Sequence, residues 1–179
     1  MQTLKLTEKD FKQVGFYKEY CGKTDVSDYD GNIEIEDNLG WLKFDKIKVT
    51  GYLSIEASDW IKASGSIEAG DWIEAGGSIE ASGSIKAGGS IKAGDWIEAS
   101  DWIKAGGSIE AAFGIVCGLF ITCKLKLSVG LRIFAGTCQW RKIDDQDKTI
   151  TCEKLESGTV EYGILVETGL PEEDKKEIN

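Results

Sequence analysis

Between Gly51 and about Gly136, the chain repeats one six-residue pattern of hydrophobic and polar positions. An isoleucine recurs at every sixth residue from Ile55 to Ile109, and an alanine follows each isoleucine by two positions. A helix would spread these isoleucines around all of its sides, because its 3.6-residue turn does not divide into six. In an extended strand the isoleucine and the alanine share one face, and the Gly, Ser and Asp residues between strands favour turns. One short strand and one corner in every six residues indicate a β-solenoid.

The outward charges favour three strands in each coil rather than two. Opposite charges often become neighbours at a spacing of eighteen residues, which stabilises stacked strands. The three outward rows are Glu74, Lys92 and Glu110; Glu68, Lys86 and Lys104; and Lys62, Glu80 and Glu98. The same spacing sets large side chains against small ones, with Ser54 and Ser90 beside Trp72, and Ser78 between Trp60 and Trp96. We therefore expect a three-sided rod.

The hydrophobic rhythm continues after the strict repeat ends near Ala111. Ile115, Ile121, Leu127 and Ile133 hold the isoleucine position, and Cys117, Cys123, Val129 and Ala135 hold the alanine position. The solenoid domain is thus predicted over 51–136, with nearly five turns and a length of roughly 20–25 Å.

The two flanks of the repeat are expected to cover the ends of the rod, where unpaired strand edges would otherwise recruit other chains. Over 1–50, Thr7 and Asp10 suggest the start of a short helix with Phe11, Val14 and Tyr17 on one side, and short strands follow before the first coil. Over 137–179, strands near 148–152 and 159–166 predict a β-hairpin around Ser157 and Gly158, before an acidic tail. The fold class is therefore all-β, a β-solenoid with a helical N-terminal cap and a β-hairpin C-terminal cap.

Charge and composition narrow the functions that such a rod can have. The net charge is −10 and the pI is about 4.6. Residues 51–112 carry ten acidic residues against four lysines, whereas 113–142 carry only basic ones. An acidic surface suits a basic protein partner, and it repels the phosphates of DNA or RNA. No stretch is apolar enough for a membrane span, and the first residues lack a signal-peptide pattern, so a cytoplasmic protein is expected.

The residues that usually carry chemistry are missing or isolated. The sequence has no histidine, and its five cysteines form no CxxC pair, so no metal site is predicted. The odd cysteine count argues against structural disulfides, and Cys117 and Cys123 are read as small buried hydrophobes. No nucleotide-binding or nucleophile motif is present. The chain is therefore expected to be neither an enzyme nor a cofactor-binding protein.

Three resemblances bear on function. The phrase Gly-Ser-Ile-Glu-Ala-Gly is similar to the repeats of left-handed β-helix acyltransferases and γ-type carbonic anhydrases, whose activities need histidines that this chain lacks. Gly65–Ala69 and Gly89–Ala93 resemble the core repeat of bactofilins, which implies a self-assembling scaffold. Acidic β-solenoids such as the pentapeptide-repeat inhibitors of topoisomerases share the design of a negatively charged rod, without sharing this repeat.

Four outward tryptophans each follow an aspartate, where other repeats have Gly-Ser. Exposed aromatic residues are common in protein interfaces, but an indole can also seal the wall over small neighbours or stack on a sugar. We expect a binding protein, an inhibitor or nucleic-acid mimic that docks on a basic surface of a nucleic-acid-handling complex, in the manner of an anti-CRISPR protein. The alternative is a bactofilin-like scaffold, a homo-oligomer. The candidate partner-binding residues are Asp59, Trp60, Asp71, Trp72, Glu74, Glu80, Asp95, Trp96, Glu98, Asp101 and Trp102.

Overall fold

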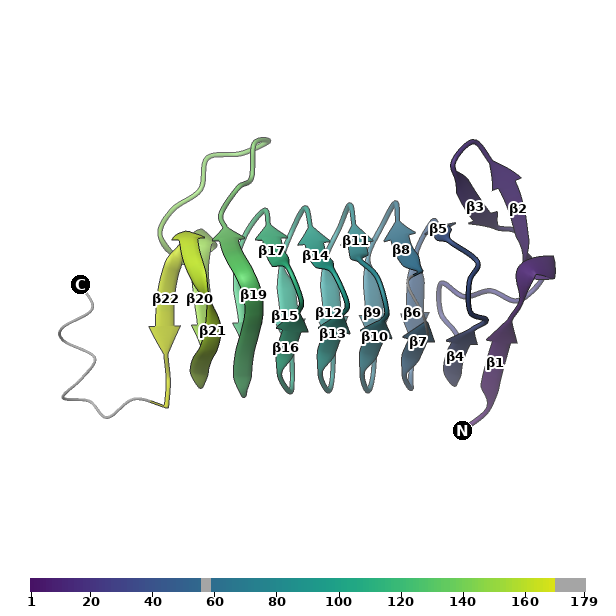
Figure 1. The fold of residues 1–179 in the computed structure, drawn as a ribbon, viewed down its shortest axis with the longest axis horizontal. Helices are drawn as coiled ribbons and strands as arrows, with labels where there is room; N and C mark the ends of the chain where they lie inside the picture. Colours follow the sequence, from purple (N-terminus) through teal and green to yellow (C-terminus); the bar gives the residue numbers. More distant parts are fainter. Residues whose placement is uncertain (56–58, 170–179) are drawn as a thin grey trace.

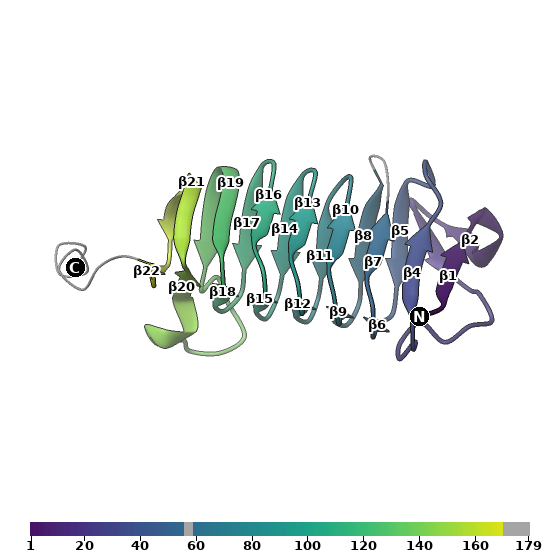
Figure 2. The same ribbon diagram turned by 90° about the horizontal axis from the view of Figure 1, so that it is seen from below.

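The computed structural model describes residues 1–55 and 59–169, which form a parallel β-solenoid of about seven turns (Figure 1). Successive coils stack along one axis, with β1 at one end of the rod and β22 at the other (Figure 2). Each regular coil contributes one strand to each of three faces, which confirms the all-β solenoid and its three sides.

We number the faces in the order in which the chain visits them. Face 1 contains β1 (Thr3–Leu6), β4 (Asn32–Ile35), β7 (Leu53–Ile55), β10 (Ile73–Ala75), β13 (Ile91–Ala93) and β16 (Ile109–Ala111). Face 2 contains β5 (Trp41–Phe44), β8 (Trp60–Ala63), β11 (Ile79–Ala81), β14 (Trp96–Ala99) and β17 (Gly114–Cys117). Face 3 contains β6 (Ile47–Val49), β9 (Ile67–Ala69), β12 (Ile85–Ala87), β15 (Ile103–Ala105), β18 (Ile121–Cys123), β20 (Thr149–Cys152) and β22 (Ile164–Glu167). The long strands β19 (Lys126–Ala135) and β21 (Lys154–Tyr162) run across faces 1 and 2.

The eighteen-residue register is confirmed in the regular part of the rod. Ile73 pairs with Ile91 on face 1, and the rows of outward charges lie as the spacing predicts. The isoleucines point inward and are fully buried, and the alanines beside them are nearly so. Each buried isoleucine contributes about 1.5–3 kcal/mol relative to an exposed one. This apolar column runs the length of the rod and holds the three faces at fixed positions.

The corners between strands depend on glycine where successive coils come closest. Gly106 donates its N–H to the carbonyl oxygen of Ala87 in the coil below, at 3.0 Å. A Cβ atom at Gly106 would overlap the carbonyl oxygen of Gly88. Glycine therefore allows the corner between faces 3 and 1 to stack at the same spacing as the paired strands on either side of it.

The repeat does not begin where the sequence suggests. Leu53, rather than Ile55, pairs with Ile73, and Ile55 takes the alanine position opposite Ala75. This coil is twenty residues long instead of eighteen, so Trp72 lies next to Tyr52 and the predicted contact with Ser54 is wrong. The two extra residues come between Leu53 and Ile61 in the sequence, a stretch that includes residues 56–58, which the structure does not describe.

A β-hairpin covers the N-terminal end of the rod, so the predicted helical cap is not found. The only helical turn near this end in the described residues is a 3-10 turn, Glu8–Asp10, where the Thr7 N–H donates to Asp10 Oδ2 at 2.8 Å. The chain then continues as antiparallel β2 (Phe11–Val14) and β3 (Tyr17–Tyr20). Gly15 lies between them with a φ of 61°, a conformation that glycine adopts without strain.

The C-terminal flank continues the solenoid, so the predicted β-hairpin cap is also wrong. β20 pairs with β18 and with β22 in parallel, and β21 pairs in parallel with β19. Between β19 and β20 the segment 136–148 projects from the rod (Figure 1). The ladder therefore extends beyond 51–136 at both ends and has about seven turns instead of five. The predicted acidic tail lies at 170–179, outside the described residues.

No helix in the described ranges is both long enough and apolar enough to cross a membrane.

Candidate protein-binding face

The four predicted tryptophans do not share one wall of the rod. Trp60 and Trp96 lie at the start of β8 and β14 on face 2. Trp72 precedes β10 on face 1, and Trp102 precedes β15 on face 3. Only Trp60 and Trp96 can therefore contact one flat partner together.

The aspartates before these tryptophans lie at the corners of the rod. Asp59 is only 3 % exposed, and its carboxylate accepts hydrogen bonds from the Leu39 N–H at 2.8 Å and the Gly40 N–H at 2.7 Å. It holds the preceding coil in place and offers no free surface to a partner. The other three are accessible corner residues: Asp71 before face 1, Asp95 before face 2 and Asp101 before face 3.

The candidate glutamates divide between two faces. Glu74 lies on face 1 and forms an ion pair with Lys92 at 3.1 Å. Glu80 and Glu98 are neighbours on face 2, where Glu80 forms an ion pair with Lys62. Burial and then the nearby Glu80 carboxylate raise the pKa of Glu98, while Lys62 partly offsets this effect. Glu98 is therefore the carboxylate of this face that would gain most from a cation on a partner.

Aromatic stacking between coils explains why several of the tryptophans fit the wall. The rings of Trp41 and Trp60 stack with centroids 5.1 Å apart, and those of Tyr52 and Trp72 stack at 4.5 Å. Trp102 is parallel to a phenylalanine of the next coil, Phe120. These contacts support the interpretation that the indoles stabilise the wall, because stacked pairs contribute about 0.5–1.5 kcal/mol beyond their burial.

Face 2 nevertheless keeps a row of large apolar side chains in contact with solvent. Trp41, Trp60 and Trp96 are 43 %, 38 % and 36 % exposed. Phe113 and Leu131, at the corner leading into face 2, are 46 % and 55 % exposed. We call the surface formed by Trp41, Trp60, Glu80, Trp96, Glu98, Phe113 and Leu131 the aromatic face.

Phe113 and Leu131, the corner residues of the aromatic face, are absent from the candidate residues predicted from the sequence. The repeat spacing nevertheless puts them in one column with Asp95. Phe113 donates its N–H to the Asp95 carbonyl at 3.1 Å, and Leu131 donates to the Phe113 carbonyl at 2.7 Å. Positions 95, 113 and 131 therefore form one column along the rod. A change from aspartate to Phe and Leu along this column is a signal that was available from the sequence.

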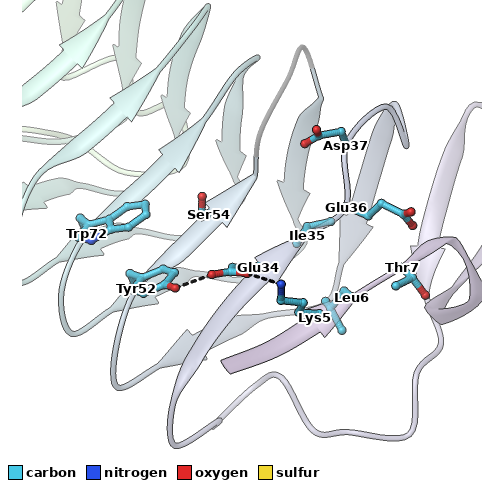
Figure 3. Close-up of a pocket in the computed structure, with 10 residues that line it drawn as sticks. All are labelled: Lys5, Leu6, Thr7, Glu34, Ile35, Glu36, Asp37, Tyr52, Ser54 and Trp72. Atoms are coloured by element: carbon cyan, nitrogen blue, oxygen red, sulfur yellow. Dashed lines mark hydrogen bonds and ion pairs between the residues drawn. The ribbon is translucent and has the colours of Figure 1, made fainter. Parts of the chain in front are cut away.

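A separate hollow lies on face 1 near the N-terminal end, with a cavity volume of about 630 Å³ (Figure 3). Its lining includes Trp72 from the predicted set, together with Tyr52 and Glu34. Glu34 is already engaged, because it accepts a hydrogen bond from the Tyr52 hydroxyl at 2.6 Å and lies 3.5 Å from Lys5 Nζ. The Tyr52 hydrogen bond, and to a smaller extent Lys5, lowers the pKa of Glu34 against the opposing effect of burial. Glu34, Tyr52 and Lys5 therefore satisfy one another, and the hollow shares no residue with the aromatic face.

Within 1–55 and 59–169, no group of three or more His, Cys, Asp or Glu side chains is arranged to hold a metal ion. Searches with this chain matched no protein-family model, no curated protein and no solved structure.

Proposed function

We propose that this chain is a non-enzymatic, cytoplasmic binding protein that docks on a protein partner through the aromatic face. The observation that carries the proposal is the row of half-exposed Trp41, Trp60 and Trp96, continued by Phe113 and Leu131, along one side of a rigid rod. Contiguous exposed apolar side chains are unusual on monomeric proteins and are common at interaction sites. Tryptophan in particular dominates binding energy when a partner covers it.

The charges of the same face suit a partner with a basic patch. Glu98 lies beside Glu80, and Lys62 pairs with Glu80, so one negative charge is left in excess at the centre of the face. A lysine or arginine of the partner opposite Glu98 would relieve the repulsion between the two carboxylates. The net charge of −10 adds long-range attraction to any basic protein.

The concrete form of the proposal is an inhibitor that occupies a basic surface of a nucleic-acid-handling complex, like an anti-CRISPR protein. Such complexes hold positively charged grooves, and an acidic rod competes there with the phosphate backbone. The acidic net charge and the rod shape support this version. Direct binding of DNA or RNA by the rod is disfavoured by the same charge.

The experiment compares two double variants in capture of partners from host lysate. Trp60→Ser with Trp96→Ser removes the centre of the aromatic face, whereas Trp102→Ser with Phe120→Ser removes an aromatic pair of face 3. A partner of the aromatic face is captured by the wild type and the face 3 variant and is lost from the face 2 variant. Equal capture by all three proteins would contradict the proposal.

One observation favours the scaffold alternative. Within the described residues, β21 and β22 each pair with one strand only, so their outer edges are open. However, Glu167 points into the end of the rod, where its Oε1 accepts the Leu155 N–H at 2.6 Å. An inward charge at a strand edge opposes the addition of another strand. Sedimentation separates the alternatives, since a scaffold gives concentration-dependent growth and an inhibitor stays at one small size.

A further inference from the structure

Two free cysteines occupy successive rungs of one inward column. On face 3 the alanine position is held by Ala105 in β15 and by Cys123 in β18. The next strand, β20, continues this register through Ile150 and Thr151, which places Cys152 directly above Cys123. Both cysteines are free and buried. They are the only such stacked pair among the cysteines of the described residues, because Cys117 faces alanine on both sides.

The geometry of the column suits a covalent bond between the two sulfurs. Neighbouring strands lie about 4.8 Å apart, which falls within the Cα separation of roughly 4.4–6.8 Å that disulfides span. The two side chains leave their strands on the same side, and both point into the core. A hydrogen bond with Cys123 lowers the pKa of the Cys152 thiol, against the opposing effects of burial and of Glu167. Cys152 is thus the better nucleophile of the two.

We propose that Cys123 and Cys152 are a modification site, a dithiol that a low-molecular-weight disulfide oxidises to a bond between β18 and β20 of face 3. The Cys152 thiolate attacks one sulfur of the oxidant and releases a first thiol. The Cys123 thiolate then attacks the mixed disulfide at Cys152 and releases a second thiol. Two protein thiols and one small disulfide become one protein disulfide and two small thiols, so atoms and electrons balance.

The position of the two cysteines near the C-terminal end of the rod determines which coils the disulfide would hold together. Cys152 belongs to the coil formed by β19 and β20, which only the last coil, β21 and β22, covers. Terminal coils of a repeat array open first. Opening of the last two coils gives the oxidant access to both buried sulfurs. After oxidation, the chain from 123 to 152, including the projecting segment 136–148, is closed into a loop, and β20 can no longer separate from β18.

The test uses the full chain treated with oxidised glutathione and then alkylated, with peptide mapping by mass spectrometry. We expect one peptide pair joined through Cys123 and Cys152, release by dithiothreitol, and a melting temperature roughly 5–15 °C above that of the reduced protein. Cys123→Ala and Cys152→Ala should abolish both effects. Cys117→Ala is the matched control, since it replaces a buried cysteine at an alanine position of face 2, and it should keep them.

The proposal is overturned if both cysteines remain alkylatable after this treatment and also after refolding from urea in a glutathione redox buffer. It is equally overturned if the bond forms but joins other cysteines, or if it persists in Cys123→Ala. The alanine variants are expected to fold, because alanine holds this position in the earlier coils.

Discussion

Deleting one six-residue repeat should rotate one half of the rod against the other without unfolding it. Removal of Gly88–Ala93 joins Ala87 directly to Gly94 and keeps the alternation of strand and corner. Every later repeat then moves by one face, so Trp96 leaves face 2 and joins face 1 above Trp72. The aromatic face is cut in two, while the inward isoleucines still stack on isoleucines.

The change in the free energy of unfolding caused by this deletion can be estimated from the outward side-chain pairs between the coils that meet at the junction. Three outward pairs meet there in the native rod, of which one is opposite in charge and two are alike: Glu74 with Lys92, Glu80 with Glu98, and Lys86 with Lys104. After the deletion two pairs are opposite and one is alike: Glu80 with Lys104, Lys86 with Glu110, and Glu74 with Glu98. Each such pair contributes about 0.2–1 kcal/mol, so the junction is not weakened. Loss of six ordered residues costs about 0.3–0.9 kcal/mol of net stability.

Urea unfolding followed by circular dichroism measures this cost, and two further deletions serve as controls. Removal of Gly76–Ala93 takes out one whole coil and leaves Trp60 and Trp96 on the same face, so both fold and partner capture should survive. Removal of only Gly88–Ser90 breaks the six-residue phase and should cost several kcal/mol. If the six-residue deletion destabilises the protein as much as the three-residue deletion, the equivalence of the three faces is wrong.

Three substitutions, together with Lys92→Ala as a control, test individual contacts by urea or thermal unfolding. Ile91→Ala removes three buried carbons and should cost about 2–5 kcal/mol, whereas the adjacent outward Lys92→Ala should cost less than about 1 kcal/mol; equal losses would contradict the inward assignment. Asp59→Ala leaves two backbone N–H groups without their acceptor and should cost about 2–4 kcal/mol, and an unchanged midpoint would refute this role. The pKa of Glu98 is raised in the folded state, so its ionisation opposes folding, and stability falls as the pH rises through the ordinary glutamate range towards neutrality. Glu98→Gln should therefore be more stable than the wild type at pH 7 and equal to it well below pH 4, and the same difference at both pH values would contradict the shift.

The regular part of the rod could be predicted because each six-residue repeat contains both the residues of its strand and the residues of its corner. The alternation of Ile and Ala defines the inward side, and the corner glycines define where each strand ends. The eighteen-residue spacing even separates Trp60 and Trp96 from Trp72 and Trp102, although the sequence analysis gives all four as candidate binding residues for one partner.

The predictions that failed concern segments where local pattern and long-range pairing disagree. Phe11 and Val14 are spaced as on a helix, but Gly15 turns the chain, and the segment forms the antiparallel strands β2 and β3 instead. Aromatic side chains of this hairpin pack against the end of the rod, where Phe11 contacts Phe44 edge to face. Ile55 imitates the repeat, yet Leu53 fits the isoleucine column with Ile33 below it and Ile73 above it. At the C-terminal end the strand predicted near 148–152 is found as β20, but the strand predicted over 159–166 divides at Gly163 between β21 and β22, and the predicted turn at Ser157 and Gly158 lies inside β21. The partners of these strands lie one coil earlier, and nothing local in the sequence specifies that choice.

Photo-crosslinking is the most direct test of the claim that the aromatic face binds a protein. A benzoylphenylalanine at position 60 or 96 lies on this face, and one at position 102 lies on face 3 of the same rod. The chain should form one and the same adduct from positions 60 and 96 in host cells, and none from position 102. Adducts of equal yield from all three positions, or from position 102 alone, would contradict the account.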